Sequence, residues 1–321
     1  MMKNDLNMNK FVPLFLFLQF ALLQLSGCSL AVYPIDDITK SPSIVLADVN
    51  KPPFADVKLV DRNDVNSDGS VIKETRIQVI PEIELELNTI FTMKYHRSLL
   101  YKAPNVNVPI KFPNGSKYIG TLDTGFGGSF LLTSDVALDN KLTIRPWLGG
   151  FIGIFHISDL SIGSAKILNA FGDYKGRQWQ FRILNIPIYK DNSVLIGLKF
   201  FQTFDYVMFD KFNQEVTFSK DGSFKPEKID LWSSYPFEIK SNRIIVEMPI
   251  NGKVYELFFD SGGGKPGLCL NKYDWQIIET GLDVKQIRKS HYYNYSFGRL
   301  PCQIAKVSEL LIGEKNCKIP K

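Results

Sequence analysis

The feature that most constrains this chain is a duplicated β-like unit in which each copy ends at an aspartate. In the first copy, Asn114-Gly115 is followed by an apolar run and then by Asp123-Thr124-Gly125. In the second copy, Asn251-Gly252 precedes Asp260-Ser261-Gly262 at the same spacing. One Asp-Thr-Gly tripeptide is weak evidence, but the repeated surroundings indicate two related folding units, each placing an aspartate at the same point.

The repeat continues downstream of both aspartates. Ile157-Ser-Asp-Leu-Ser-Ile162-Gly163 in the first half has a counterpart in Val307-Ser-Glu-Leu-Leu-Ile312-Gly313 in the second. Short apolar runs separated by turn residues dominate from Thr75 onward, and long amphipathic helical stretches are nearly absent. The pattern therefore predicts an all-β architecture.

This arrangement resembles the aspartic proteases of the pepsin and retropepsin type, over roughly residues 86–321. The first half adds the segment Val194–Asp210, in which Ile196-Gly197 is similar to the hydrophobic-hydrophobic-Gly segment beside the family's catalytic loop. The resemblance implies a bilobal acid-protease fold, with two barrel-like lobes facing a cleft. It also implies that Asp123 and Asp260 form a catalytic dyad, flanked by the residues that support the two loops: Thr124, Gly125, Ser261, Gly262, Ile196 and Gly197.

Two adjacent carboxyl groups suit peptide hydrolysis without a metal. Because they cannot both ionise readily, they share one proton, so that one acts as base toward water while the other acts as acid. Glycine allows a close backbone approach, and a threonine or serine hydroxyl can brace one loop against the other. The alternative interpretation is that each Asp-x-Gly is only a turn between strands.

Two details of the loops bear on pH and on substrate access. The third residues after the aspartates, Phe126 and Gly263, have no side-chain donor that would favour the charged carboxylate, so we expect activity between weakly acidic and neutral pH. The segment Arg145–Ile157 places glycines between aromatic residues, which suits a mobile lid with Trp147, Gly149 and Gly150. An ordinary β-hairpin explains that composition equally well.

The amino terminus has the features of an export signal. Lys3 and Lys10 precede an apolar stretch, Phe11–Leu25, that is short for a transmembrane helix. It leads into Leu25-Ser26-Gly27-Cys28, which resembles the bacterial lipobox, and this implies lipidation of Cys28 and a cell-envelope location in the outer membrane. An ordinary signal peptide or an uncleaved anchor is the alternative.

Residues 28–75 are polar and rich in Pro and Asp, and are predicted to be a tether. Within them Asp64, Asn66 and Asp68 match the first half of a calcium loop, but the twelfth position is Thr75 rather than a carboxylate, so a solvated turn is the better interpretation. We expect no cofactor and no metal site, since no Cys/His spacing indicates zinc.

Charge and cysteine content bear on nucleic-acid binding and on disulfide formation. Loss of residues 1–27 removes two lysines and one aspartate, so the net charge falls from +5 to +4, and no basic cluster indicates nucleic-acid binding. Beside Cys28 the chain has Cys269, Cys302 and Cys317. A disulfide between the last two is possible, but pairing cannot be deduced from sequence.

The predicted organisation is a signal peptide at 1–27, a tether at 28–75, a first lobe at 76–225 and a partial second lobe at 226–321. The second lobe is expected to be truncated, because nothing corresponding to Val194–Phe218 follows Gly313. The predicted function is an aspartic endopeptidase acting on extended polypeptides, as a monomer or a homodimer. The alternative is an envelope lipoprotein that binds peptide or glycan without cleaving it.

Overall fold

The computed structural model describes the chain in segments dominated by β-strands. They cover residues 29–34, 45–65, 71–79, 82–86, 90–96, 105–147, 152–175, 177–183, 186–190, 194–229, 232–263, 268–270, 272–294, 298–312 and 315–318. The helices within these ranges are short, the longest being α4 (Lys272–Glu279). The all-β prediction is confirmed.

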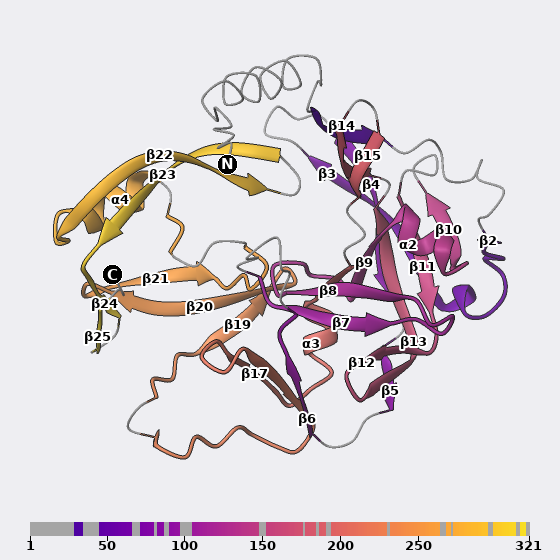
Figure 1. The fold of residues 1–321 in the computed structure, drawn as a ribbon, viewed down its shortest axis with the longest axis horizontal. Helices are drawn as coiled ribbons and strands as arrows, with labels where there is room; N and C mark the ends of the chain where they lie inside the picture. Colours follow the sequence, from indigo (N-terminus) through magenta and orange to yellow (C-terminus); the bar gives the residue numbers. More distant parts are fainter. Residues whose placement is uncertain are drawn as a thin grey trace, which may run out of the picture.

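A closed six-stranded barrel lies at the centre of the first unit, which we define as residues 84–219. Its strands pair in the order β12-β7-β8-β16-β9-β13, and β13 pairs again with β12 to close the ring. The strands are β7 (Asn107–Lys111), β8 (Lys117–Asp123), β9 (Phe130–Thr133), β12 (Leu160–Ile162), β13 (Ala165–Lys175) and β16 (Val194–Gly197). Figure 1 shows β7 and β8 crossing the middle of the molecule.

The barrel closes around one apolar core because its strands alternate inward and outward side chains. Phe130 and Leu132 on β9 are buried, whereas Leu131 between them is partly exposed. Val108 and Ile110 repeat this alternation on β7. The interior positions are branched or aromatic, so they fill the ring without a channel.

Other elements of the first unit surround the barrel. The hairpin of β10 (Thr143–Trp147) and β11 (Ile152–Ile157) extends the sheet beyond β13, and β5 (Glu84–Glu86) also pairs with β13. A separate three-stranded sheet contains β6 (Ile90–Lys94), β17 (Tyr206–Asp210) and β18 (Glu215–Ser219). The short helices α2 (Ser134–Asp139) and α3 (Leu198–Phe201) follow β9 and β16 directly.

Part of the segment predicted as a tether packs against the first unit. Phe54, in the 3₁₀ turn η3 (Phe54–Asp56), is buried with Ile154 and Phe171 in a small cluster on the outer face of the sheet. Strand β2 (Val45–Leu46) pairs with β10. The few apolar residues within a polar stretch therefore attach it to the barrel, which composition alone did not indicate.

The remaining amino-terminal strands form two small sheets. β1 (Ser29–Pro34) pairs with β14 (Arg177–Ile183), which also pairs with β15 (Ile186–Lys190). β3 (Lys58–Val65) and β4 (Val71–Val79) form a hairpin.

The second unit, residues 237–318, repeats the order of elements seen in the first. β20 (Arg243–Ile250) and β21 (Lys253–Phe258) correspond to β7 and β8, and α4 corresponds to α2. The hairpin of β22 (Val284–Asn294) and β23 (Gly298–Val307) corresponds to β10 and β11. β19 (Phe237–Lys240), β24 (Glu309–Ile312) and β25 (Lys315–Lys318) complete the unit.

One strand pairing shows that the two units are duplicates in structure as well as in sequence. Ile110 of β7 lies opposite Ile162 of β12, and Ile250 of β20 lies opposite Ile312 of β24. Both isoleucines of the second pair belong to the repeat that the sequence predicted. Figure 1 shows β20 and β21 in orange beside the barrel, with the β22–β23 hairpin arching apart from them.

Three further observations concern the cysteines, the possible metal ligands and the helices among the described residues. Cys269 and Cys302 are free, so the possible bridge between Cys302 and Cys317 is not formed. Across the described segments, no group of three or more His, Cys, Asp or Glu side chains could hold a metal ion. None of the described helices is long and apolar enough to cross a membrane.

Candidate active site

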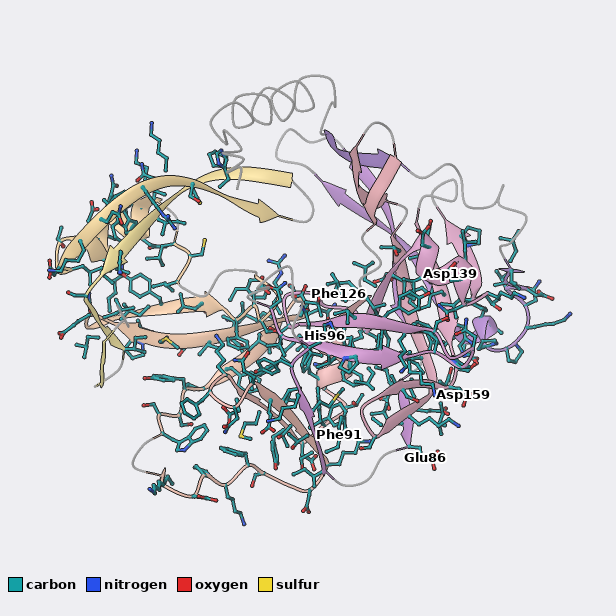
Figure 2. All side chains as sticks on the ribbon, in the orientation of Figure 1. Glu86, Phe91, His96, Phe126, Asp139 and Asp159 are labelled. Carbon is teal, nitrogen blue, oxygen red and sulfur yellow. The ribbon has the colours of Figure 1, made fainter. Side chains whose placement is uncertain are left out.

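The site begins where β8 ends, at Asp123. β8 lies between β7 and β16, and Gly197 at the end of β16 is directly opposite Asp123 in the parallel pairing. Beyond Asp123 the chain turns back, with the Phe126 amide donating to the Asp123 carbonyl at 3.2 Å. The barrel thus holds the first aspartate at the mouth of a tight turn between two strands. Figure 2 shows Phe126, in this turn, at the centre of the molecule where the two units meet.

Each aspartate is oriented by its own loop. The Gly125 amide donates to Asp123 Oδ1 at 2.8 Å, and the Phe126 amide donates to the same oxygen at 3.2 Å. In the second unit the Gly262 amide donates to Asp260 Oδ1, also at 2.8 Å. The two tripeptides therefore adopt the same local geometry, in which the amide of the glycine fixes the carboxylate of the aspartate.

The two loops are locked together by four reciprocal hydrogen bonds. The Thr124 amide donates to Ser261 Oγ at 3.0 Å, and the Ser261 amide donates to Thr124 Oγ1 at 3.0 Å. The hydroxyl of Thr124 donates to the Phe259 carbonyl at 2.9 Å, and the hydroxyl of Ser261 donates to the Leu122 carbonyl at 2.8 Å. Each hydroxyl both accepts and donates across the interface, so each loop braces the other.

The glycines allow the two carboxyl groups to meet. A Cβ atom on Gly262 would lie 2.2 Å from Asp123 Cγ, and one on Gly125 would lie 2.7 Å from Asp260 Cγ. Real Cβ contacts are never this short, so each loop needs glycine because the opposite aspartate occupies the space of a side chain. The structure brings Asp123 and Asp260, which are far apart in sequence, into one pair.

The pair is electrostatically unequal. The pKa of Asp123 is raised to about 6, first by burial and then by the charge of the nearby Asp260 carboxylate and its hydrogen bond, while the amides of Gly125 and Phe126 oppose the rise. Asp260 is exposed, whereas Asp123 is partly buried. The proton that two adjacent carboxyl groups share is therefore favoured on Asp123.

Ile196-Gly197 supports the first loop from behind. The Gly197 amide donates to the Ser129 carbonyl at 2.8 Å, and the Leu198 amide donates to the Phe126 carbonyl at 2.7 Å. A Cβ atom on Gly197 would lie 2.3 Å from the Gly128 carbonyl oxygen. Ile196 is fully buried in the barrel core. This segment therefore fixes the path of the loop.

The second loop lacks an equivalent support within the described residues. β21, which leads to Asp260, pairs with β20 on one side, and no described strand pairs with its other side. In the first unit that side of β8 is occupied by β16. The position of Asp260 therefore depends on the reciprocal hydrogen bonds from the first unit.

The lid hypothesis is tested only in part. β10 and β11 form the expected hairpin, and Trp147 lies at the end of β10 opposite Ile152. Gly149 and Gly150, at the tip, lie outside the described residues. Cys28, Asn66 and Asp68 also lie outside them, so lipidation and the calcium-loop resemblance stay predictions; Asp64 lies on β3.

Sequence reasoning missed Asp173, a carboxylate beside the first loop. Its Oδ2 atom lies 3.0 Å from the place of a Cβ atom on Gly128. Burial raises the pKa of Asp173 to about 6, although the charge of Lys199 opposes the rise. The only sequence signal was a charged residue near the end of an apolar strand, between Gly172 and the buried Tyr174.

Comparison with known proteins adds little. No protein-family model matches the chain, and no curated protein matches it. Among solved structures, the chain is similar to a retropepsin-like aspartic protease from Rickettsia conorii, with a TM-score of 0.27 and 16% sequence identity. The match covers 43% of this chain and 94% of that one. A likeness of this size carries no argument, so the functional conclusions rest on the geometry above.

Proposed function

We propose that this protein is an aspartic endopeptidase that hydrolyses peptide bonds with Asp123, Asp260 and one water molecule. The observation that carries the proposal is the carboxyl pair itself. Two loops distant in sequence are held together by four reciprocal hydrogen bonds, and each loop has a glycine where any side chain would overlap the opposite carboxyl group. A pair of simple turns would not need this reciprocity.

Because Asp123 is more buried than Asp260, we assign the acid role in the first chemical step to Asp123 and the base role to Asp260. The exposed Asp260 carboxylate accepts a proton from water, and the water oxygen bonds to the carbonyl carbon of the substrate. The protonated Asp123 carboxyl donates its proton to the carbonyl oxygen. The tetrahedral intermediate then collapses as Asp260 returns a proton to the amide nitrogen, the C–N bond breaks, and Asp123 recovers the proton from the hydroxyl group.

The substrate class follows from the shape of the proposed reaction. Two adjacent carboxyl groups can act together on the carbonyl group and the nitrogen of one peptide bond only where that bond is accessible along an extended chain. An extended polypeptide that adds as a strand, with backbone pairing and side-chain pockets, meets this requirement. We therefore propose polypeptides as substrates.

The location is proposed from the amino-terminal sequence. The apolar stretch Phe11–Leu25 and the Leu-Ser-Gly-Cys28 motif support a lipid anchor in the bacterial cell envelope, in the outer membrane. Cys28→Ser should prevent both lipidation and signal removal, leaving a longer precursor. Metabolic labelling with a fatty-acid analogue tests this, and equal labelling of the wild type and the variant would exclude Cys28 as the lipid site.

One observation favours a second candidate function, a binding protein without peptidase activity. Asp260 is exposed, and β21 has no described strand on the side that β16 occupies beside β8. A carboxylate held on one side only could lack the fixed position that catalysis needs. The same region would then bind extended peptide or glycan without cleaving it.

Digestion of a peptide library by the full-length protein separates the two functions. The wild type should cleave, whereas Asp123→Asn should not, because the amide cannot supply the shared proton. Asp159→Asn is the matched control, since Asp159 is an exposed residue that pairs with Lys166 and lies well away from Phe126 in Figure 2. Binding of peptides without cleavage by any form would support the second function instead.

A further inference from the structure

Strand pairing places Asp173 on the same face of the barrel as Asp123. In the ladders, Asp173 is directly opposite Leu131, Leu131 is opposite Leu195, and Leu195 is opposite Thr121. Residues that are directly opposite on neighbouring strands share a face. Thr121 precedes Asp123 by two positions on β8, so these two also share a face. Both aspartates therefore lie on the outer face of the barrel strands, and the approach of Asp173 to Gly128, in the loop after Asp123, places them near one another.

The separation suits a substrate subsite. β13 is three strands from β8 in the order β8-β16-β9-β13, neighbouring strands are about 4.8 Å apart, and Thr121 lies two residues before Asp123. The path from Asp173 to Asp123 along the curved sheet is therefore about 16 Å, and the direct separation across the closed barrel is shorter. An extended peptide advances about 3.3 Å per residue. A substrate centred on the dyad would therefore reach Asp173 within about four residues of the cleaved bond.

The carboxylate of Asp173 also touches the loop that carries Asp123. Its Oδ2 atom lies 3.0 Å from where a Cβ atom of Gly128 would be, and the Phe126 ring borders the same space at 2.5 Å. Gly128 thus has no side chain where the acid approaches. The loop backbone, the aromatic ring and the carboxylate form one surface next to the dyad.

Asp173 has no charge partner of its own in the described part of the chain. Its neighbours bury it in part, and no described residue forms a hydrogen bond or an ion pair with it. Lys199 influences it only from a distance, and Arg145, on the same face beyond Ile154, donates to the Val57 carbonyl at 3.1 Å. A largely desolvated carboxylate of this kind is costly unless a cation compensates it.

We propose that Asp173 is a specificity-determining residue that binds the cationic side chain of a substrate lysine or arginine within four residues of the cleaved bond. The inference rests on the proposed peptidase function. A cation in this subsite would exchange its hydration for a poorly solvated carboxylate, so that it gains more than it would from an exposed acid. The cost of burying the Asp173 carboxylate in the free protein would then be offset by the substrate cation in the complex.

Peptide pairs that differ by lysine against norleucine, at each of four positions on either side of the cleaved bond, test the proposal in the full-length protein. Norleucine keeps the aliphatic stem and removes the charge. We expect the wild type to prefer lysine at one position by about tenfold or more in kcat/KM, and Asp173→Asn to reduce this ratio to about one. Asp159→Asn, whose residue at φ 62° tolerates asparagine, should leave the ratio unchanged.

Two further measurements distinguish specificity from a structural role. Lys199→Gln removes a competing cation and should increase the preference for lysine. The ratio for wild type should also increase between pH 5 and pH 7 as Asp173 ionises, because the dyad affects both peptides equally and cancels. A ratio that is the same in Asp173→Asn and the wild type, or that favours lysine at no position, would overturn the proposal.

If the wild type cleaves no peptide, the proposed peptidase function fails and the inference is decided by binding. Fluorescence anisotropy of the same labelled pairs with full-length Asp123→Asn should show tighter binding of the lysine peptide, about tenfold. This difference should disappear in the double variant with Asp173→Asn. Equal affinities for the two peptides, or no binding of either, would contradict a cation subsite at Asp173.

Discussion

The two units carry the same loop on very different supports. In the first unit β8 is a central strand of a closed barrel, and Gly120, Thr121 and Leu122, which precede Asp123, are buried. In the second unit β21 is paired on one side, and Val254, Phe258 and Phe259 around it are exposed. The two aspartates nevertheless have equivalent hydrogen bonds to their glycines. The difference shows that the second loop is held in place mainly by its hydrogen bonds with the first loop, and less by the strands of its own unit.

The contrast extends to the cores. The main cluster of the first unit joins strands from the barrel with β6 and β18, whereas the cluster of the second unit is built on three buried residues, Ile250, Tyr255 and Ile278. The β22–β23 hairpin pairs with no other strand in the described residues, while its counterpart β10–β11 is joined to β13. Hydrophobic stabilisation scales with buried area, so the second unit is expected to be the weaker.

The largest expected effect tests whether both units contribute to one site. Asp123→Asn and Asp260→Asn should each reduce kcat by about a thousandfold or more, because each removes one partner of the proton exchange. Steady-state kinetics on a cleaved library peptide measures this. If Asp260→Asn were silent while Asp123→Asn was inactive, the site would be formed by two first units in a homodimer.

A second comparison uses one glycine close to each aspartate: Gly197, which is opposite Asp123 on β16, and Gly263 in the loop of Asp260. Gly197→Ala should destabilise the protein by about 2 kcal/mol, since the new Cβ would lie 2.3 Å from the rigid backbone oxygen of Gly128. Gly263→Ala changes a glycine of the second loop, at the position that corresponds to Phe126, where the nearest atom is Asp260 Oδ2 at 3.3 Å, and should cost far less. Urea denaturation of the full-length variants compares them, and equal losses would contradict the difference in support.

The pH dependence of stability tests whether burial raises the pKa of Asp123 in the dyad. The pKa of Asp123 is raised to about 6 in the folded protein, above its unfolded value of about 3.9, so its contribution to stability is present below pH 3.9 and is lost as the pH rises through 6. Asp123→Asn should therefore increase stability at pH 7.5 by on the order of 2 kcal/mol, and have little effect at pH 3.5. Thermal unfolding at both pH values measures this, and a stability loss at pH 7.5 would oppose it.

The smallest effect concerns local opening. Backbone amides of β20 and β21 should exchange with solvent at least about tenfold faster than those of β7 and β8, because fewer buried contacts hold the former strands. Hydrogen exchange followed by mass spectrometry resolves the two hairpins. Equal protection would show that the second unit is as stable as the first, despite its exposed apolar residues.

Much of the site could be predicted because it is local. Asp123-Thr124-Gly125 and Asp260-Ser261-Gly262 each predict a tight turn after a strand. Their repetition predicts that the two aspartates form a pair. Asp173 could not be found in this way, because a single acid in an apolar strand has no local pattern. Only the pairing of β13 with β9, and of β9 with β16, brings it onto the face of the dyad.

The polar segment before the first unit shows the same limit. Its composition indicates a tether, yet Phe54 is buried against Ile154 and Phe171. Composition averages over a window, whereas one aromatic residue can attach a segment if the fold presents a complementary surface.

The sequence by itself determined the all-β architecture, the internal duplication and the identity of the two loops, since alternation, turn residues and repeats are properties of neighbouring positions. Tertiary structure decided which carboxyl group of the dyad is buried and which is exposed. It also decided that Gly125 and Gly262 have no room for a side chain, and that Asp173 lies beside the first loop. These depend on long-range contacts that form only when strands distant in the chain pair, and burial and electric fields, which set the pKa of Asp123, exist only in that arrangement.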